Sequence, residues 1–65
     1  MGALILRLPD VINKTALSRS AIYDLIAKGN FPKQIKLTSR SSGWLQSEVE
    51  QWIDDRIALR DSEVA

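Results

Sequence analysis

The chain has 65 residues, a net charge of +1, no cysteine, no histidine, and 45% hydrophobic residues. The lack of cysteine excludes disulfides and thiolate metal sites, and the lack of histidine removes the commonest general base and metal ligand. No apolar run reaches the length of a membrane span. We therefore expect one small cytoplasmic domain that folds by apolar packing, is not an enzyme, and needs no metal, cofactor or small-molecule ligand.

Charge is distributed unevenly along the chain. Residues 1–45 carry seven Lys or Arg against two Asp, a net charge of +5, whereas residues 46–65 carry two Arg against six Asp or Glu, a net charge of −4. A basic part favours contact with a polyanion, and an acidic part favours exposure to water or contact with another protein.

The chain begins with a strand and a short helix. We expect residues 1–3 to form a flexible terminus and residues 4–8, which are mostly apolar, to contain a small strand. Pro9 fits the first turn of a helix, because an N–H at that position would have no helical partner. Asp10 then adds favourable negative charge at the helix N-terminus.

Residues 15–32 predict the turn and second helix of a helix-turn-helix. Leu17 should be buried between the two helices, and the hydroxyl of Ser18 should cap the second helix by accepting from a free backbone N–H. Helix-forming residues then run from 19 to 28. Gly29 favours the left-handed conformation that ends a helix.

The second helix has an apolar face and a polar face. At about 100° per residue, the apolar face comprises Ala21, Ile22, Leu25 and Ile26, and the outer face comprises Ser20, Tyr23, Asp24 and Ala27, with Arg19 on its flank. Such a helix can pack on a domain and enter a DNA groove, although an ordinary amphipathic surface helix has the same pattern. We expect Asp24 to pair with Lys28, four residues later, rather than with a base.

A polar, turn-rich stretch separates two further strands. Residues 34–38 alternate between apolar and polar, and residues 43–46 resume apolar character. We expect a β-hairpin, or wing, with Arg40 at or near its tip. The strand near residues 4–7 would stabilise this hairpin as a third strand, since an isolated hairpin is marginal in water.

The last element should be a third helix, from about residue 48 to residue 60, followed by a flexible tail over residues 61–65. Ser47 and Glu50 have the spacing of a capping box, with Ser47 as the N-cap. The expected core stripe is Val49, Trp52, Ile53 and Ile57. Trp44 should also belong to the core rather than stack on bases.

Together these elements predict a mainly α fold with a small β wing. It is a winged helix-turn-helix of three helices and a two- or three-stranded antiparallel sheet, formed as one domain by residues 4–60. Arginine can donate bidentately to guanine, and Ser, Tyr and Lys commonly position phosphates. The candidate DNA-binding residues are Ser18, Arg19, Ser20, Tyr23, Lys28, Lys33, Lys36, Ser39, Arg40 and Ser41. Any one of them alone is as typical of a solvated surface, but the joint pattern favours double-stranded DNA as the partner.

Several motifs resemble the AlpA family of small prophage-associated DNA-binding regulators, which is related to phage excisionases and MerR-like winged helices. They are Leu6-Arg7-Leu8-Pro9-Asp10-Val11, Leu17-Ser18-Arg19-Ser20-Ala21-Ile22-Tyr23, Gly29-Asn30-Phe31-Pro32, Lys36-Leu37, Gly43-Trp44 and Ser47-Glu48-Val49-Glu50-Gln51-Trp52. The resemblance covers about residues 5–58. It implies that the recognition helix starts at Ser18, Arg19, Ser20 and Tyr23 and that the wing spans residues 36–42. One departure is Thr38, which stands where family wings often have Gly in the pattern Gly-x-Arg-x-x-x-Trp.

The resemblance implies a sequence-specific transcriptional regulator of prophage or genomic-island genes that acts near an integrase gene or attachment site. Two alternatives stay open. One is an excisionase, or recombination directionality factor, that bends DNA, self-associates on DNA repeats and contacts a recombinase. The other is a small protein-binding inhibitor of another regulator, acting through the acidic third helix. Salt-sensitive affinity for DNA separates the protein-binding inhibitor from the two DNA-binding functions, because a pure protein binder has no such affinity.

Overall fold

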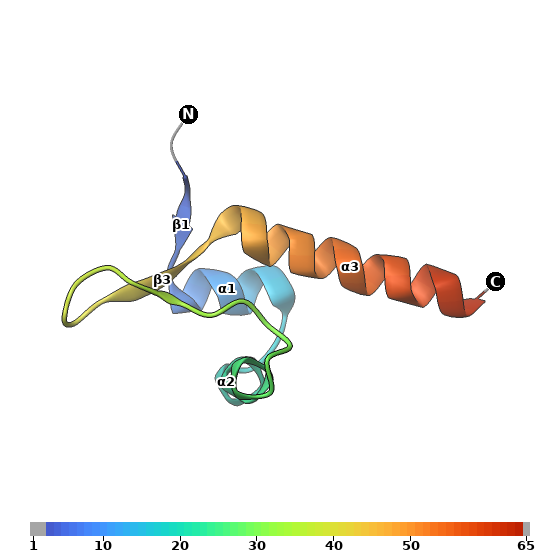
Figure 1. The fold of residues 1–65 in the computed structure, drawn as a ribbon, viewed down its shortest axis with the longest axis horizontal. Helices are drawn as coiled ribbons and strands as arrows, with labels where there is room; N and C mark the ends of the chain where they lie inside the picture. The colour runs from blue at the N-terminus through green and yellow to red at the C-terminus, as the bar shows by residue number, and fades with distance from the viewer. Residues whose placement is uncertain (1–2, 65) are drawn as a thin grey trace.

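The computed structural model describes residues 3–64. Its elements are, in chain order, β1 (Ile5–Leu6), α1 (Leu8–Thr15), α2 (Arg19–Ala27), β2 (Ile35–Lys36), β3 (Ser42–Leu45) and α3 (Gln46–Val64). In Figure 1, the long α3 runs beside α1, α2 is seen end-on, and the loop between β2 and β3 extends away from the helices. Three helices and a three-stranded antiparallel sheet confirm the predicted winged helix-turn-helix.

The turn between α1 and α2 is held by side-chain and backbone hydrogen bonds. The Thr15 hydroxyl donates to the Val11 carbonyl at 2.7 Å and accepts from the Leu17 N–H at 3.2 Å. Ala16 takes a left-handed conformation with φ 61°, and its N–H donates to the Ile12 carbonyl at 2.8 Å. Leu17, which was expected to be buried, is half-buried and packs against the core. The turn therefore fixes how α2 sits on α1.

α2 begins and ends close to where its sequence predicts. The Ser18 hydroxyl accepts from the Ala21 N–H at 3.1 Å. At the other end, Gly29 is left-handed with φ 77°, and the Asn30 N–H donates to the Leu25 carbonyl at 2.8 Å. The predicted apolar face (Ala21, Ile22, Leu25, Ile26) is buried or half-buried, and the predicted outer face (Ser20, Tyr23, Asp24, Ala27) is exposed.

β3 is the central strand of the sheet, which has the order β1-β3-β2. Ile5 pairs with Leu45 on one side, and Ile35 pairs with Gly43 on the other. β1 therefore supplies the third strand that the hairpin was expected to need.

The strands differ in length from the prediction. β1 stops at Leu6, because α1 begins at Leu8 with Pro9 in its first turn. β2 stops at Lys36, since the Thr38 hydroxyl accepts from the N–H groups of Arg40 at 3.2 Å and Ser41 at 3.1 Å and closes a tight turn. This turn places Arg40 at the tip of the wing, as predicted.

Within the described part of the chain, the buried side chains of the core are Val11, Ile22, Phe31, Trp44 and Val49. They come from all three helices, from the central strand and from the segment that follows α2. Trp44 is 1% exposed, and its indole N–H donates to the Pro32 carbonyl at 3.0 Å. The prediction that Trp44 belongs to the core is confirmed.

The stripe predicted for α3 is correct over its first half only. Val49 is fully buried, and Ile53 and Trp52 are half-buried against the core. The Trp52 ring meets Phe31 edge-on with ring centroids 4.9 Å apart, and its N–H donates to the Asn30 carbonyl at 2.7 Å. Ile57 is 43% exposed, so its assignment to the core is wrong. Figure 1 shows the reason: the C-terminal half of α3 extends past the end of α1, beyond the other helices and strands.

The prediction that Ser47 caps the third helix in a capping box with Glu50 is also wrong. α3 begins at Gln46, directly after β3, and the Gln46 N–H donates to the Leu4 carbonyl at 2.9 Å. A carbonyl beside β1 thus replaces the side-chain cap. The Glu50 carboxylate instead accepts from the Gln46 side-chain amide at 3.3 Å and pairs with Lys14 at 3.2 Å.

α3 ends later than predicted. It continues to Val64, so residues 61–64 of the expected tail are helical. Met1 and Gly2 of the expected flexible N-terminus, and Ala65 of the tail, lie outside the described residues. Over residues 3–64, no helix combines the length and apolar character that crossing a bilayer requires.

Candidate nucleic-acid interface

The outer face of α2 carries three of the predicted DNA-binding residues. Arg19, Ser20 and Tyr23 are exposed, and Arg19 takes part in no ion pair within residues 3–64. The Tyr23 ring lies against that of Trp44, with centroids 6.5 Å apart and planes tilted by 59°. This contact holds the ring in place while leaving Tyr23 38% exposed. α2 thus presents a short, exposed polar face, while its opposite, apolar face packs on the domain.

Two predicted residues at the ends of α2 already have partners inside the protein. The Ser18 hydroxyl is occupied as the helix cap. Lys28 pairs with Asp24 at 3.0 Å, as predicted from their spacing. Both side chains of this pair are more than half exposed, so it stabilises the helix only weakly. It nevertheless balances the charge of Lys28.

The wing and the segment that leads into it carry the other five predicted residues. Lys33, Lys36, Ser39 and Arg40 are exposed, and Ser41 is half-buried. All five line one hollow of about 560 Å³ that reaches Ile26 on α2. Among the residues that the structure describes, no carboxylate lines this hollow. The three cations therefore gather on one concave surface between the wing and α2, where they raise the local positive potential.

A second hollow, of about 420 Å³, adds a residue that the sequence analysis did not select. Arg7, which precedes α1, lines it together with Tyr23 of α2 and Arg40 of the wing. The sequence alone predicts Arg7 within or beside a short apolar strand. The positive charge of Arg7 just before a helix was the one sign in the sequence that it could bind DNA. Its proximity to Tyr23 and Arg40 is visible only in the fold.

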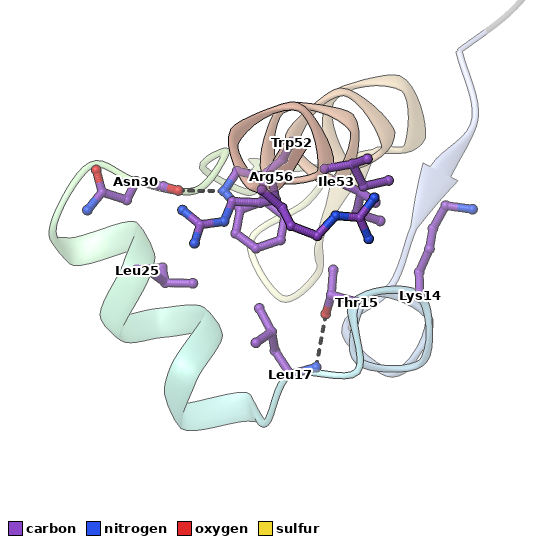
Figure 2. Close-up of a pocket in the computed structure, with 10 residues that line it drawn as sticks. Lys14, Thr15, Leu17, Leu25, Asn30, Trp52, Ile53 and Arg56 are labelled. Atoms are coloured by element: carbon purple, nitrogen blue, oxygen red, sulfur yellow. Dashed lines mark hydrogen bonds between the residues drawn. The ribbon is translucent and has the colours of Figure 1, made fainter. Parts of the chain in front are cut away.

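A third hollow lies away from these residues, between α3 and the turn of the helix-turn-helix. In Figure 2, Trp52 and Arg56 extend from α3 toward Leu17 and Leu25 across this groove, which has a volume of about 610 Å³. None of the ten predicted DNA-binding residues lines it. Its cations are already engaged: Lys14 pairs with Glu50, Arg60 pairs with Asp61, and Arg56 lies 5.9 Å from the ring centre of Trp52. The groove offers an apolar surface rather than free charge.

The helix-turn-helix pair, the sheet and the exposed loop between β2 and β3 define a winged helix-turn-helix protein. The chain belongs to the family of prophage CP4-57 regulatory proteins (AlpA), whose sequence model matches residues 4–57. The family resemblance seen in the sequence motifs is therefore confirmed.

Two relatives support this assignment. The "DNA-binding transcriptional activator AlpA" of Escherichia coli (strain K12) is 39% identical over 61 residues, which cover 85% of this chain and 87% of the relative. "Uncharacterized protein ORF88" of Enterobacteria phage P4 is 51% identical over 55 residues, which cover 85% of this chain. The match spans 62% of the ORF88 protein's own length.

Proposed function

We propose that this protein is a sequence-specific DNA-binding transcriptional regulator of prophage or genomic-island genes, acting in the cytoplasm near an integrase gene or attachment site. Membership of the AlpA family and similarity to a DNA-binding transcriptional activator support this proposal. We assign it no enzymatic activity.

One observation about the structure carries the proposal. Two hollows at the wing reach α2 at Ile26 and at Tyr23, and among the described residues their charged lining is arginine or lysine and no carboxylate. The acidic residues of the chain are concentrated in α3 instead. We propose that α2 enters the major groove and that the wing follows the phosphate backbone or the adjacent minor groove.

A gel-shift series with fragments of the host integration region tests this function. The protein should bind one fragment selectively, and its affinity should fall steeply between about 50 and 200 mM salt, because phosphate contacts release counterions. A footprint on that fragment then gives the operator. A protein without salt-sensitive DNA affinity would instead be the protein-binding inhibitor considered above.

The excisionase alternative makes a different prediction in the same system. An excisionase should protect several direct repeats and bend the fragment, which a circular-permutation gel detects as a change of mobility with the position of the site. A simple regulator should protect a compact operator.

Arg19 should contribute to sequence specificity. Arg19→Ala should lower the affinity for the selected fragment by about 1–3 kcal/mol and relax the preference at one base pair, because an arginine at the start of a recognition helix can read guanine bidentately. Gel shifts with single-base variants of the operator measure both effects. Arg60→Ala is a matched control, since it removes the same charge from α3, where Arg60 pairs with Asp61. Wild-type binding by Arg19→Ala would make Arg19 a solvated side chain.

Arg40 should contribute to affinity without sequence preference. Arg40→Ala should weaken binding to the operator and to random DNA alike, and it should make the slope of log affinity against log salt shallower by roughly one unit. The reason is that Arg40 lies exposed at the wing tip, outside any ion pair within residues 3–64. A salt slope equal to that of the wild type would contradict this role.

A further inference from the structure

Two arginines from distant parts of the chain meet at the hollow of about 420 Å³. Arg7 lies between β1 and α1, and Arg40 lies at the wing tip. Tyr23, on the outer face of α2, lines the same hollow, and no carboxylate from residues 3–64 does. The fold therefore brings residues from three separate parts of the chain to one concave surface.

Both guanidinium groups are available for a ligand. Within residues 3–64, neither Arg7 nor Arg40 forms an ion pair, and their hydrogen bonds involve backbone atoms alone: the N–H group of each residue donates, and the Arg7 carbonyl accepts from the Val11 N–H. The acidic residue nearest in sequence to Arg7 is Asp10, whose carboxylate accepts from the Arg7 backbone N–H at 3.1 Å and does not line the hollow. Two like charges beside one hollow repel each other unless an anion lies between them.

The chemistry of these groups matches a phosphate. Each guanidinium presents five N–H donors in a planar fork that suits phosphate oxygens. The Tyr23 hydroxyl can add a further donor, and the contact between its ring and Trp44 limits how far it moves.

We infer that Arg7, Tyr23 and Arg40 together hold a single backbone phosphate of the DNA, an inference that rests on the proposed function. One phosphate would then be tied to the start of α1, to the recognition helix and to the wing. Such a contact carries no base preference of its own, but it fixes the depth and register at which α2 enters the major groove.

A double-mutant cycle tests the shared contact on a duplex of about 20 base pairs at about 50 mM salt. Arg7→Ala and Arg40→Ala should each weaken binding about tenfold, the loss expected for one charge-assisted contact. If both arginines hold one phosphate, the double variant should bind about as weakly as either single variant. A double variant that loses the product of the two factors, about a hundredfold, would place the arginines on separate phosphates and overturn the inference. An unchanged affinity for Arg7→Ala would overturn it as well.

Three further variants sharpen the result. Arg60→Ala removes the same charge from α3, where Arg60 pairs only with its neighbour Asp61, and should bind DNA as the wild type does. Arg7→Lys keeps the charge but loses the planar fork, so it should recover part of the affinity lost in Arg7→Ala. Tyr23→Phe removes only the hydroxyl and should lose less affinity than either arginine variant.

Folding and the proposed function are checked separately. Arg7→Ala should melt at the wild-type temperature, because the Arg7 side chain forms no hydrogen bond or ion pair with any residue from 3 to 64. Wild-type protein that fails to bind DNA in a salt-dependent way would refute both the proposed function and the phosphate contact. Salt-dependent wild-type binding with additive arginine variants would refute the shared contact alone.

Discussion

Trp44→Ala should leave most of the protein unfolded at room temperature. Trp44 is the largest of the fully buried side chains, and its indole N–H satisfies the Pro32 carbonyl. Removing a buried tryptophan costs about 3–5 kcal/mol of the free energy of unfolding. A domain of this size has a total stability of about 3–10 kcal/mol at the usual value per residue. Far-UV circular dichroism, followed through a thermal and a urea transition, measures the loss.

Two comparison variants separate packing from hydrogen bonding. Trp44→Phe keeps a ring in the core and loses the indole donor, so it should stay folded at a lower melting temperature. Trp52→Ala should cost less than Trp44→Ala, because Trp52 is only half-buried and lies at the edge of the core. A Trp44→Ala protein that melts within a few degrees of the wild type would show that the core does not depend on this side chain.

The parts of the fold that were predicted correctly depend on local interactions. Ser18 marks the start of α2 and Gly29 marks its end, through hydrogen bonds and backbone conformations that involve residues within one turn. The alternation of polar and apolar residues likewise located the hairpin, and a short apolar segment before Pro9 supplied its third strand.

The predictions that failed depend on interactions between distant residues. The start of α3 is set by the Leu4 carbonyl, which receives the Gln46 N–H across the sheet. The capping-box pattern at Ser47 is local, so it cannot predict a hydrogen bond to the distant Leu4 carbonyl. Periodicity identified the inward side of α3 correctly at Val49, but it cannot show how far along the helix the rest of the protein extends, so Ile57 was misplaced.

The candidate site divides in the same way. Composition and amphipathicity identified the exposed face of α2 and the basic wing, and the structure places the wing residues around one hollow. Their contacts with DNA stay a prediction, which the Arg19 and Arg40 variants test. Arg7 was missed because its position beside Tyr23 and Arg40 depends on how three elements pack, over more than thirty positions of sequence.

Gly43→Val should separate β1 from the rest of the sheet and strongly destabilise the protein. A Cβ atom at Gly43 would collide with the Ile5 side chain and would lie 2.9 Å from the Leu6 carbonyl oxygen. The Leu6 oxygen belongs to the backbone of a paired strand, so it can move only if β1 and β3 move apart. That movement would also disturb the hydrogen bond between the Leu4 carbonyl and the Gln46 N–H at the start of α3.

The expected cost of Gly43→Val is about 1–3 kcal/mol or more, since valine adds two further carbons where even one does not fit. The melting temperature should fall by roughly 4–8 °C for each kcal/mol in a domain of this size. Gly29→Asn is the matched control: a Cβ at Gly29 meets nothing within 4 Å, and asparagine tolerates the left-handed conformation that Gly29 adopts. Its melting temperature should stay close to that of the wild type. If Gly43→Val melts no lower than Gly29→Asn, β1 does not lie as close to the central strand as the sheet requires, and the position of Arg7 beside the wing fails with it.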